Sequence, residues 1–482
     1  MPLKGVTLDM DDLVRHVCDL AKRRGADFAD ARAVRRHGES VLVQDGRADK
    51  LAASADCGIG VRVLVGRAWG FASADSLQRR RAEQCVDDAI ALAKASEAVV
   101  TDPARMAAVE AVEAEDRTEP EVPPGAMPVA EKIDRLLQYE RAGRAAASDG
   151  HQIVNAIVSY AQAWREETLA NTAGTLLRSA GSRAVATTLF VASDGEILQR
   201  GTEQRGIVGG AELLRRVQPE PFSVRAARKA VAALDAKPAP AGRFTVLFHP
   251  SITGLLVHEA LGHNAEADSV WAGESILEGR LGEEIASPAV SVWDDSTLPG
   301  QFGSFAYDSE GTPGRRRPLI QEGRLVAYLH SLETAAKFDA DPTGSARAES
   351  YDCRPLVRMS NTFLAPAGAD TGVPLAEMMR GIDRGVYLED GHWGYVFVQK
   401  GQFICHAGQA HMIEDGEIGE PLRDVSISSL TLDVLKNIDA VGEDFEMEMP
   451  GMCGKDGQSA PTDCGGPHVR VRDVVVGGHH TL

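Results

Sequence analysis

Hydrophobic and polar positions follow two different periods along the first part of the chain. Apolar residues recur at helical spacing over residues 13–21 and again over residues 76–97, which predicts two helices. Between them, Val61, Val63 and Val65 alternate with other residues, as expected of a half-buried strand, and Asp45-Gly46 is a hairpin signal. The pattern therefore predicts helices packed on an antiparallel sheet.

An acidic, proline-containing segment at residues 102–124 interrupts this pattern. It lacks large apolar residues, so we expect a solvated loop or linker. The same pattern then returns, with helices expected at residues 129–147 and 223–234 and strands at residues 153–164 and 184–191. The run K-P-A-P-A-G at residues 237–242 cannot continue a helix and is typical of an interdomain hinge.

The part of the chain after this hinge has a different pattern, with short apolar runs separated by glycines. Apart from a helix after His249-Pro250 and another near residues 430–438, it predicts short strands, with turns at Asp415-Gly416 and Gly477-Gly478. The predicted fold class is therefore α+β. We expect an N-terminal α/β domain over residues 1–236 and a β-rich C-terminal domain over residues 243–482.

Composition and charge narrow the class of protein. The 482 residues include 51 Lys+Arg and 70 Asp+Glu, a net charge of −19, which argues against nucleic-acid or anionic-membrane partners. No run approaches the roughly 18 apolar residues of a membrane span, and residues 1–12 do not resemble a signal peptide. Seven thinly spread cysteines suit free thiols in a reducing compartment. We expect a soluble cytoplasmic protein.

The main chemical signal is the string H-E-x-x-x-H at residues 258–263. His258 and His263 can ligate a divalent metal, and Glu259 can take a proton from water that the metal polarises. In the familiar zinc-protease string the histidines are four apart on one helical face. Here they are five apart, roughly 140° around a regular helix. The helix must therefore widen by a π-bulge or break, which Gly262 would permit.

The residues alone leave the third metal ligand open, because a catalytic zinc site needs three protein ligands. The candidates are Glu266, Asp268, His406, His411, Cys453 and Cys464. Glycines flank Cys453 and allow close backbone approach, while Lys455 would favour its thiolate. The acidic neighbour of Cys464 would raise the pKa of that thiol. Spacing does not decide between a cysteine and an acidic ligand.

The ordered motifs of the chain resemble those of the TldD/PmbA peptidases. They include H-E-A-L-G-H at 258–263, D-S-E-G-T-P-G at 308–314, R-M-S-N-T at 358–362 and C-G-K-D-G-Q-S at 453–459. The resemblance implies a peptidase with one Zn²⁺ per chain, ligated by His258, His263 and Cys453, with Glu259 as general base. It also implies the TldD branch, because the other branch lacks the H-E-x-x-x-H residues.

The resemblance further implies dimers, either homodimers or heterodimers with a PmbA-like subunit. Their N-terminal domains would enclose the site and admit short or unfolded peptides. Many relatives carry a glycine-rich run where this chain has E-D-G-H-W-G at residues 389–394, so specificity can differ if that run lines the cleft. Two other functions are compatible with these residues: a non-catalytic binding or partner subunit, and a metal-dependent amidase acting on a small molecule. Glu259 argues against the first, because a purely structural site needs no base.

Overall fold

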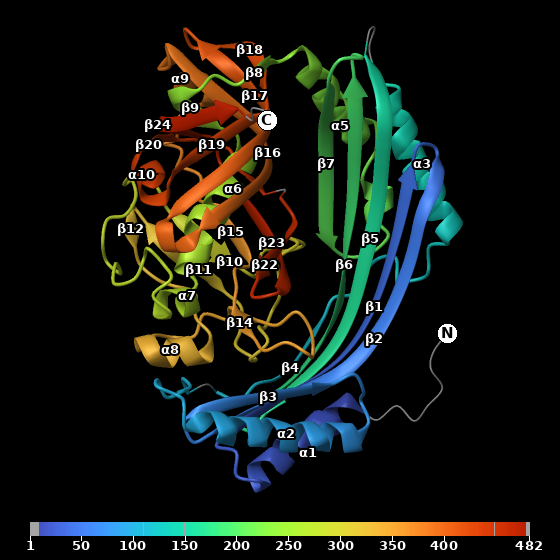
Figure 1. Ribbon diagram of the computed structural model, residues 1–482, viewed down its shortest axis with the longest axis vertical. Helices are drawn as coiled ribbons and strands as arrows, with labels where there is room; N and C mark the ends of the chain where they lie inside the picture. The colour runs from blue at the N-terminus through green and yellow to red at the C-terminus, as the bar shows by residue number, and fades with distance from the viewer. Residues whose placement is uncertain (1–8, 109, 148–150, 448, 479–482) are drawn as a thin grey trace.

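The computed structural model describes residues 9–108, 110–147, 151–447 and 449–478. Its first part is a long, strongly curved seven-stranded sheet that bends around the rest of the molecule (Figure 1). The strands are β1 (Phe28–Gln44), β2 (Arg47–Val65), β3 (Ala68–Ala74), β4 (Glu113–Arg117), β5 (Gln152–Asn171), β6 (Leu176–Ser193) and β7 (Leu198–Val208). Their order is β3-β2-β1-β5-β6-β4, and β7 also pairs with β6. This curvature makes one face of the sheet concave toward the C-terminal half (Figure 1).

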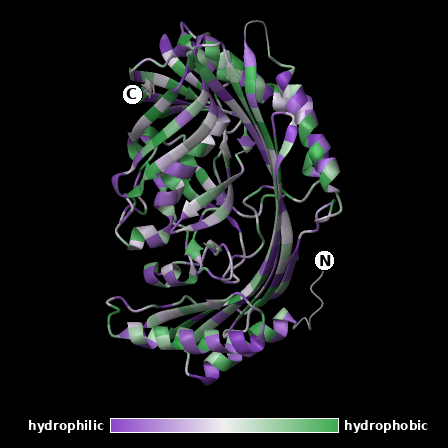
Figure 2. Cartoon of the chain, turned by 45° about the vertical axis from the view of Figure 1, so that its right-hand side comes forward, coloured by the Kyte–Doolittle hydropathy of each residue, from purple (hydrophilic) through white to green (hydrophobic). Residues whose placement is uncertain are grey.

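Helices cover the outer face of the curved sheet and form several apolar clusters with it. They are α1 (Met10–Arg23), α2 (Arg79–Glu97), α3 (Val129–Arg144), α4 (Leu213–Arg216) and α5 (Pro219–Asp235). Helices α1 and α2 pack on β1 and β2 at one end, while α3 packs on β1 and β5 nearer the other end. Hydrophobic and hydrophilic residues alternate along these strands and helices, as Figure 2 shows. Helix α1 and strand β6 bury one face each, whereas β1 is buried on both faces over residues 29–34.

The C-terminal half contains two larger sheets. One has the order β16-β9-β24-β19-β17-β18-β8, with β20 on β24, and the other has the order β12-β11-β10-β15-β23-β21, with β22 on β23. The strands of the first are β8 (Lys237–Pro238), β9 (Gly242–Phe248), β16 (Arg384–Phe397), β17 (Gln402–Glu414), β18 (Glu417–Arg423), β19 (Val425–Leu430), β20 (Ile438–Val441) and β24 (Val469–Gly478). Those of the second are β10 (Val292–Asp295), β11 (Arg316–Gln321), β12 (Arg324–Leu325), β15 (Asn361–Leu364), β21 (Glu446–Met447), β22 (Gly451–Lys455) and β23 (Gln458–Gly466).

A short helical segment packs against both of these sheets. It begins as α6 (Pro250–Leu256), continues as a π-helical turn (Val257–Gly262) and a 3₁₀ turn (His263–Ala265), and leads into α7 (Ala267–Trp271). Helix α6 contacts β16 of one sheet and β15 and β23 of the other. The remaining elements are α8 (Leu332–Phe338), α9 (Leu375–Arg380), α10 (Thr431–Lys436) and the hairpin of β13 (Ala346–Arg347) and β14 (Leu356–Val357).

Arginines on the concave face of the curved sheet join it to the C-terminal half. Arg32 donates to the Cys353 carbonyl at 2.6 Å, and Arg183 donates to the Phe302 carbonyl at 2.8 Å. Each guanidinium thus donates a hydrogen bond to a backbone carbonyl that would otherwise lack this donor at the junction.

The observed fold confirms the predicted α+β class, and the expected helices are present. The strands expected at residues 153–164 and 184–191 lie within the longer β5 and β6. Two local expectations were wrong. The acidic segment contains β4, which pairs in parallel with β6, because main-chain hydrogen bonds to a sheet edge need no apolar side chains. Gly477 and Gly478 lie in β24 and form no turn. The division into domains at residues 236–243 stays a prediction. None of the helices that the structure describes is long and apolar enough to span a bilayer.

Candidate metal centre

The π-helical turn aligns the two histidines. Pro250 occupies the first turn of α6, and the His249 side chain caps its start by accepting from the Ser251 backbone N–H at 3.2 Å. A π turn takes more residues per turn than an α turn, so His258 and His263 face one another with ring centroids 5.3 Å apart. The predicted widening of the helix is confirmed.

Gly262 allows this geometry for a reason that the sequence did not suggest. Its backbone angles, φ −55° and ψ −52°, are ordinary helical values that any residue adopts. A Cβ at this position would lie 1.9 Å from Sδ of Met359, which is fully buried. Glycine is therefore required for space beside Met359, and its backbone angles make no use of glycine's conformational freedom.

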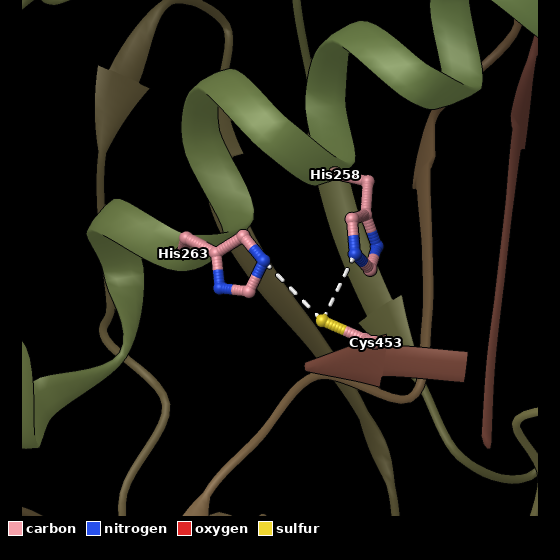
Figure 3. A group of neighbouring side chains, drawn as sticks. All are labelled: His258, His263 and Cys453. Carbon is pink, nitrogen blue, oxygen red and sulfur yellow. Dashed lines mark hydrogen bonds between the residues drawn. The ribbon is translucent and has the colours of Figure 1, made fainter. Parts of the chain in front are cut away.

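Three side chains converge at this turn. The Nε2 atoms of His258 and His263 each lie 3.3 Å from Sγ of Cys453, which β22 supplies (Figure 3). The three ligand atoms all lie within 4.8 Å of one another. A tetrahedral zinc ion, with Zn–N of about 2.0–2.1 Å and Zn–S of about 2.3 Å, needs N···S separations of about 3.5 Å. The two imidazoles and the thiol therefore fit a divalent metal of the zinc type.

The two imidazoles control the charge of the thiol. Burial opposes ionisation of Cys453, but His258 and His263 overcome it and lower the pKa of the thiol to about 4. The Lys455 amine, which the sequence suggested would favour the thiolate, binds two carboxylates, Glu266 at 3.0 Å and Asp268 at 2.6 Å, and the two histidines are the main causes of the lowered pKa. Cys453 is therefore poised as a thiolate, the form that ligates metals.

Glu259 lies beside this group and lines the same cavity. Burial raises the pKa of its carboxyl group, while His258 and His263 oppose the rise. Strand β16 passes close to it, since a Cβ at Gly394 would lie 3.0 Å from Glu259 Cγ and 3.3 Å from Cys405 Sγ. The carboxyl group is thus held in a confined, largely desolvated position next to a candidate ligand.

The other sequence candidates for the third ligand lie outside the metal group that the described residues form. Glu266 accepts from His263 Nδ1 at 3.2 Å, and Lys455 and His263 overcome its burial to lower the pKa of its carboxyl group to about 2. His406 and His411 lie on β17, with His411 Nδ1 3.4 Å from a Glu389 carboxylate oxygen. For Cys464, burial first and then Asp463 raise the pKa of the thiol well above its ordinary value, so it stays protonated.

A large cavity of about 1340 Å³ opens onto the metal group. Both halves of the chain line it: β7 and α5 from the N-terminal half, and β16, β22 and the π turn from the C-terminal half. The Lys229 amine of α5 forms ion pairs with Glu203 of β7 and Asp390 of β16, each at 2.7 Å. It thereby joins the two halves of the chain at the wall of the cavity. Sequence patterns did not reveal Lys229 or Glu203, because a lysine on an amphipathic helix is usually a solvated side chain.

The run at residues 389–394 forms part of this cavity wall. Glu389, Asp390, Gly391 and Gly394 all line the cavity. The Gly391 backbone N–H donates to Ser251 Oγ at 3.0 Å, which fixes the run beside the start of α6. Acidic side chains outnumber basic ones in the lining, eight to five. The run that was expected to line the cleft therefore does contribute to the wall of this cavity.

Comparisons with known proteins identify the family. The PmbA/TldA metallopeptidase C-terminal domain matches residues 241–478, domain 1 of that family matches residues 29–93, and its central domain matches residues 122–234. This chain belongs to the PmbA/TldA metallopeptidase family. A Methanothermobacter thermautotrophicus protein named metalloprotease is 39% identical over 98% of this chain and 99% of its own length.

Two other relatives of this chain carry more specific names. A Haemophilus influenzae protein named metalloprotease TldD homolog is 27% identical over 96% of this chain and 95% of its own length. A Saccharolobus solfataricus protein named zinc metalloprotease TldD homolog is also 27% identical, over 95% of this chain and 98% of its own length. The crystal structure of TldE from Thermococcus kodakarensis shares the fold, with a TM-score of 0.76 at 17% identity over 97% of this chain and all of its own.

Proposed function

We propose that this chain is a zinc-dependent peptidase that hydrolyses peptide bonds in short or unfolded peptides. The observation that carries the proposal is the convergence of His258, His263 and Cys453, with their ligand atoms within 4.8 Å of one another. Glu259 lies next to this group in the chain and lines the same cavity. A buried donor set of two imidazoles and a thiolate is characteristic of a metal site, and a carboxylate beside it is characteristic of hydrolysis.

The roles of the side chains follow from their positions. A zinc ion bound by His258, His263 and Cys453 would supply Lewis-acid polarisation of the scissile carbonyl and of a water molecule. Glu259 accepts the proton of the attacking water and delivers it to the leaving amine. Its carboxyl group suits both steps, because burial raises its pKa and makes the protonated form easier to reach.

The cavity supports a peptide as the substrate. Its volume of about 1340 Å³ is larger than the roughly 300–1,000 Å³ of a small-molecule pocket, which favours a peptide over the small substrate of an amidase. Because acidic side chains outnumber basic ones in its lining, neutral or basic peptides should bind better than acidic ones. This preference should weaken with salt, which screens charge interactions.

Metal analysis of two cysteine variants tests the ligand set. Purified protein should hold about one Zn²⁺ per chain, and Cys453→Ala should lose most of it. Cys464→Ala is the matched control, because this thiol is also buried but stays protonated. An empty site in Cys464→Ala together with a full site in Cys453→Ala would show that the assignment is wrong.

A variant of Glu259 tests the chemistry. Glu259→Gln should keep its zinc but lose peptide hydrolysis by about 10²-fold or more, because glutamine cannot accept the proton of water. The measurement is the cleavage rate of an unstructured peptide by variant and wild type of equal zinc content. Turnover at the wild-type rate would exclude Glu259 as the base and favour a non-catalytic binding subunit.

A further inference from the structure

The two histidines of the metal group differ in what their second ring nitrogen contacts. His263 Nδ1 lies 3.2 Å from Glu266 Oε2. His258 Nδ1 is buried and has no hydrogen-bond partner among the residues that the structure describes. Both rings direct Nε2 toward Cys453 Sγ at the same 3.3 Å. Only the His263 ring is therefore oriented by a carboxylate.

The position of Glu266 is strongly determined. Its side chain is 1% exposed, and Oε2 accepts from Lys455 Nζ at 3.0 Å as well as from His263. The Arg358 guanidinium lies 3.9 Å from Oε1. These contacts hold Glu266 Oε2 beside His263 Nδ1, where an Nδ1–H donates to the carboxylate. Nε2 is then the ring nitrogen that faces Cys453 Sγ.

Lys455 extends this arrangement to the strand that supplies the thiol. It lies on β22 two residues after Cys453, and its amine contacts Glu266, which lies between the 3₁₀ turn and α7. The chain of contacts from β22 through Lys455 and Glu266 to His263 thus links the strand that carries the thiol to the helix that carries both imidazoles. The link would fix the distance between ligands that are 190 residues apart in the sequence.

We propose that Glu266 is a positioning residue of the metal centre. It fixes the tautomer and the ring orientation of His263, and through Lys455 it fixes the spacing between His263 and Cys453. Carboxylate partners of metal-ligating histidines typically change metal affinity by about 10–100-fold. The inference rests on the proposed function, because it requires that the three side chains bind a metal ion.

Zinc affinity of the full-length chain tests this role. The dissociation constant is measured for metal-free protein by competition with a chromophoric chelator, in wild type, Glu266→Gln and Asp268→Asn. Asp268→Asn is the matched control: Asp268 binds the same Lys455 amine, at 2.6 Å, and the change removes the same charge. Glu266→Gln should weaken zinc binding by about 10–100-fold, whereas Asp268→Asn should change it by no more than about threefold.

A spectroscopic measurement separates positioning from a general loss of charge. Cobalt-loaded Glu266→Gln should show shifted d–d absorption bands, because His263 no longer has a fixed orientation, while cobalt-loaded Asp268→Asn should match wild type. If Glu266→Gln does not fold, Glu266→Asp keeps the charge but shortens the reach to His263, and it should weaken zinc binding in the same range. Equal weakening by Glu266→Gln and Asp268→Asn, or wild-type affinity in the Glu266 variants, would overturn the inference. Absence of zinc binding by wild type would instead reject the proposed function.

Discussion

Replacement of Gly262 by alanine tests whether space beside Met359 determines the geometry of the metal centre. Gly262 is the last residue of the π turn and directly precedes His263. The new methyl group would lie 1.9 Å from Met359 Sδ and 3.2 Å from its Cγ. Met359 is fully buried, so it cannot swing into solvent. Either Met359 must repack within the core or the π turn must move, and His263 would move with the turn.

The expected free-energy changes follow from known costs of core packing. Gly262→Ala should destabilise the metal-free protein by about 1–3 kcal/mol through overpacking. Met359→Ala should destabilise it by about 2–5 kcal/mol through loss of contacts and a cavity. In the double variant the new methyl group occupies space that the methionine has left. Its destabilisation should therefore be smaller than the sum of the two single effects by about 0.5–3 kcal/mol.

Urea unfolding, followed by circular dichroism, measures these differences, with the zinc dissociation constant as a second readout. Gly454→Ala is a suitable control, because Gly454 is adjacent to Cys453 and a Cβ there would meet nothing within 4 Å. It should change stability by no more than about 0.5 kcal/mol. Equal stability of Gly262→Ala and Gly454→Ala, or additive effects of the Gly262 and Met359 changes, would refute a packing role for Gly262.

Two further predictions concern pH and assembly. Burial would raise the pKa of the Glu203 carboxyl group, but Arg225 and Lys229 overcome it and lower that pKa below its ordinary 4.5. The stabilisation by Glu203 is therefore complete above about pH 4.5 and is lost as the pH falls through the lowered pKa. Urea midpoints at pH 7 and pH 4 should differ less in Glu203→Gln than in wild type, and equal differences would contradict this. We also expect a dimer, with itself or with a PmbA-like subunit, that cleaves an unstructured peptide but spares a stable folded domain. Light scattering and paired digests measure this, and a monomer that degrades both substrates equally would exclude an enclosed site.

Residues with strong periodic patterns were predicted well from the sequence. The helix expected at residues 76–97 corresponds to α2 (Arg79–Glu97), and the helix expected at residues 223–234 lies within α5 (Pro219–Asp235). These segments bury one face, so hydrophobic spacing specifies them directly. Strand β4 was missed because its residues Glu113–Arg117 are almost all charged, and only backbone pairing with β6 makes them a strand.

The helix geometry of the metal group could be predicted from the sequence, but its third ligand could not be identified from neighbouring residues. The five-residue spacing of His258 and His263 required a widened helix, and the π turn provides it. Neighbouring residues could not identify the third ligand, because Glu266 and Cys453 were both plausible by residue type. The choice depends on which side chain the fold brings to the Nε2 side of the rings and which to the Nδ1 side. That is a long-range property, since β22 is about 190 residues away from the helix.

The groups proposed to act in hydrolysis and the groups proposed to select a substrate come from different halves of the chain. The three candidate ligands and Glu259 all come from the C-terminal half, where two sheets hold the helical segment in place. The opposite wall of the cavity includes Thr202–Arg205 of β7 and Lys229 of α5, which belong to the N-terminal half. Changes in that wall can alter what binds without disturbing the ligand set, because the only described residues that converge as a metal group lie on the other wall. Lys229 limits this independence, since its bond to Asp390 couples the N-terminal wall to the strand that packs against Glu259.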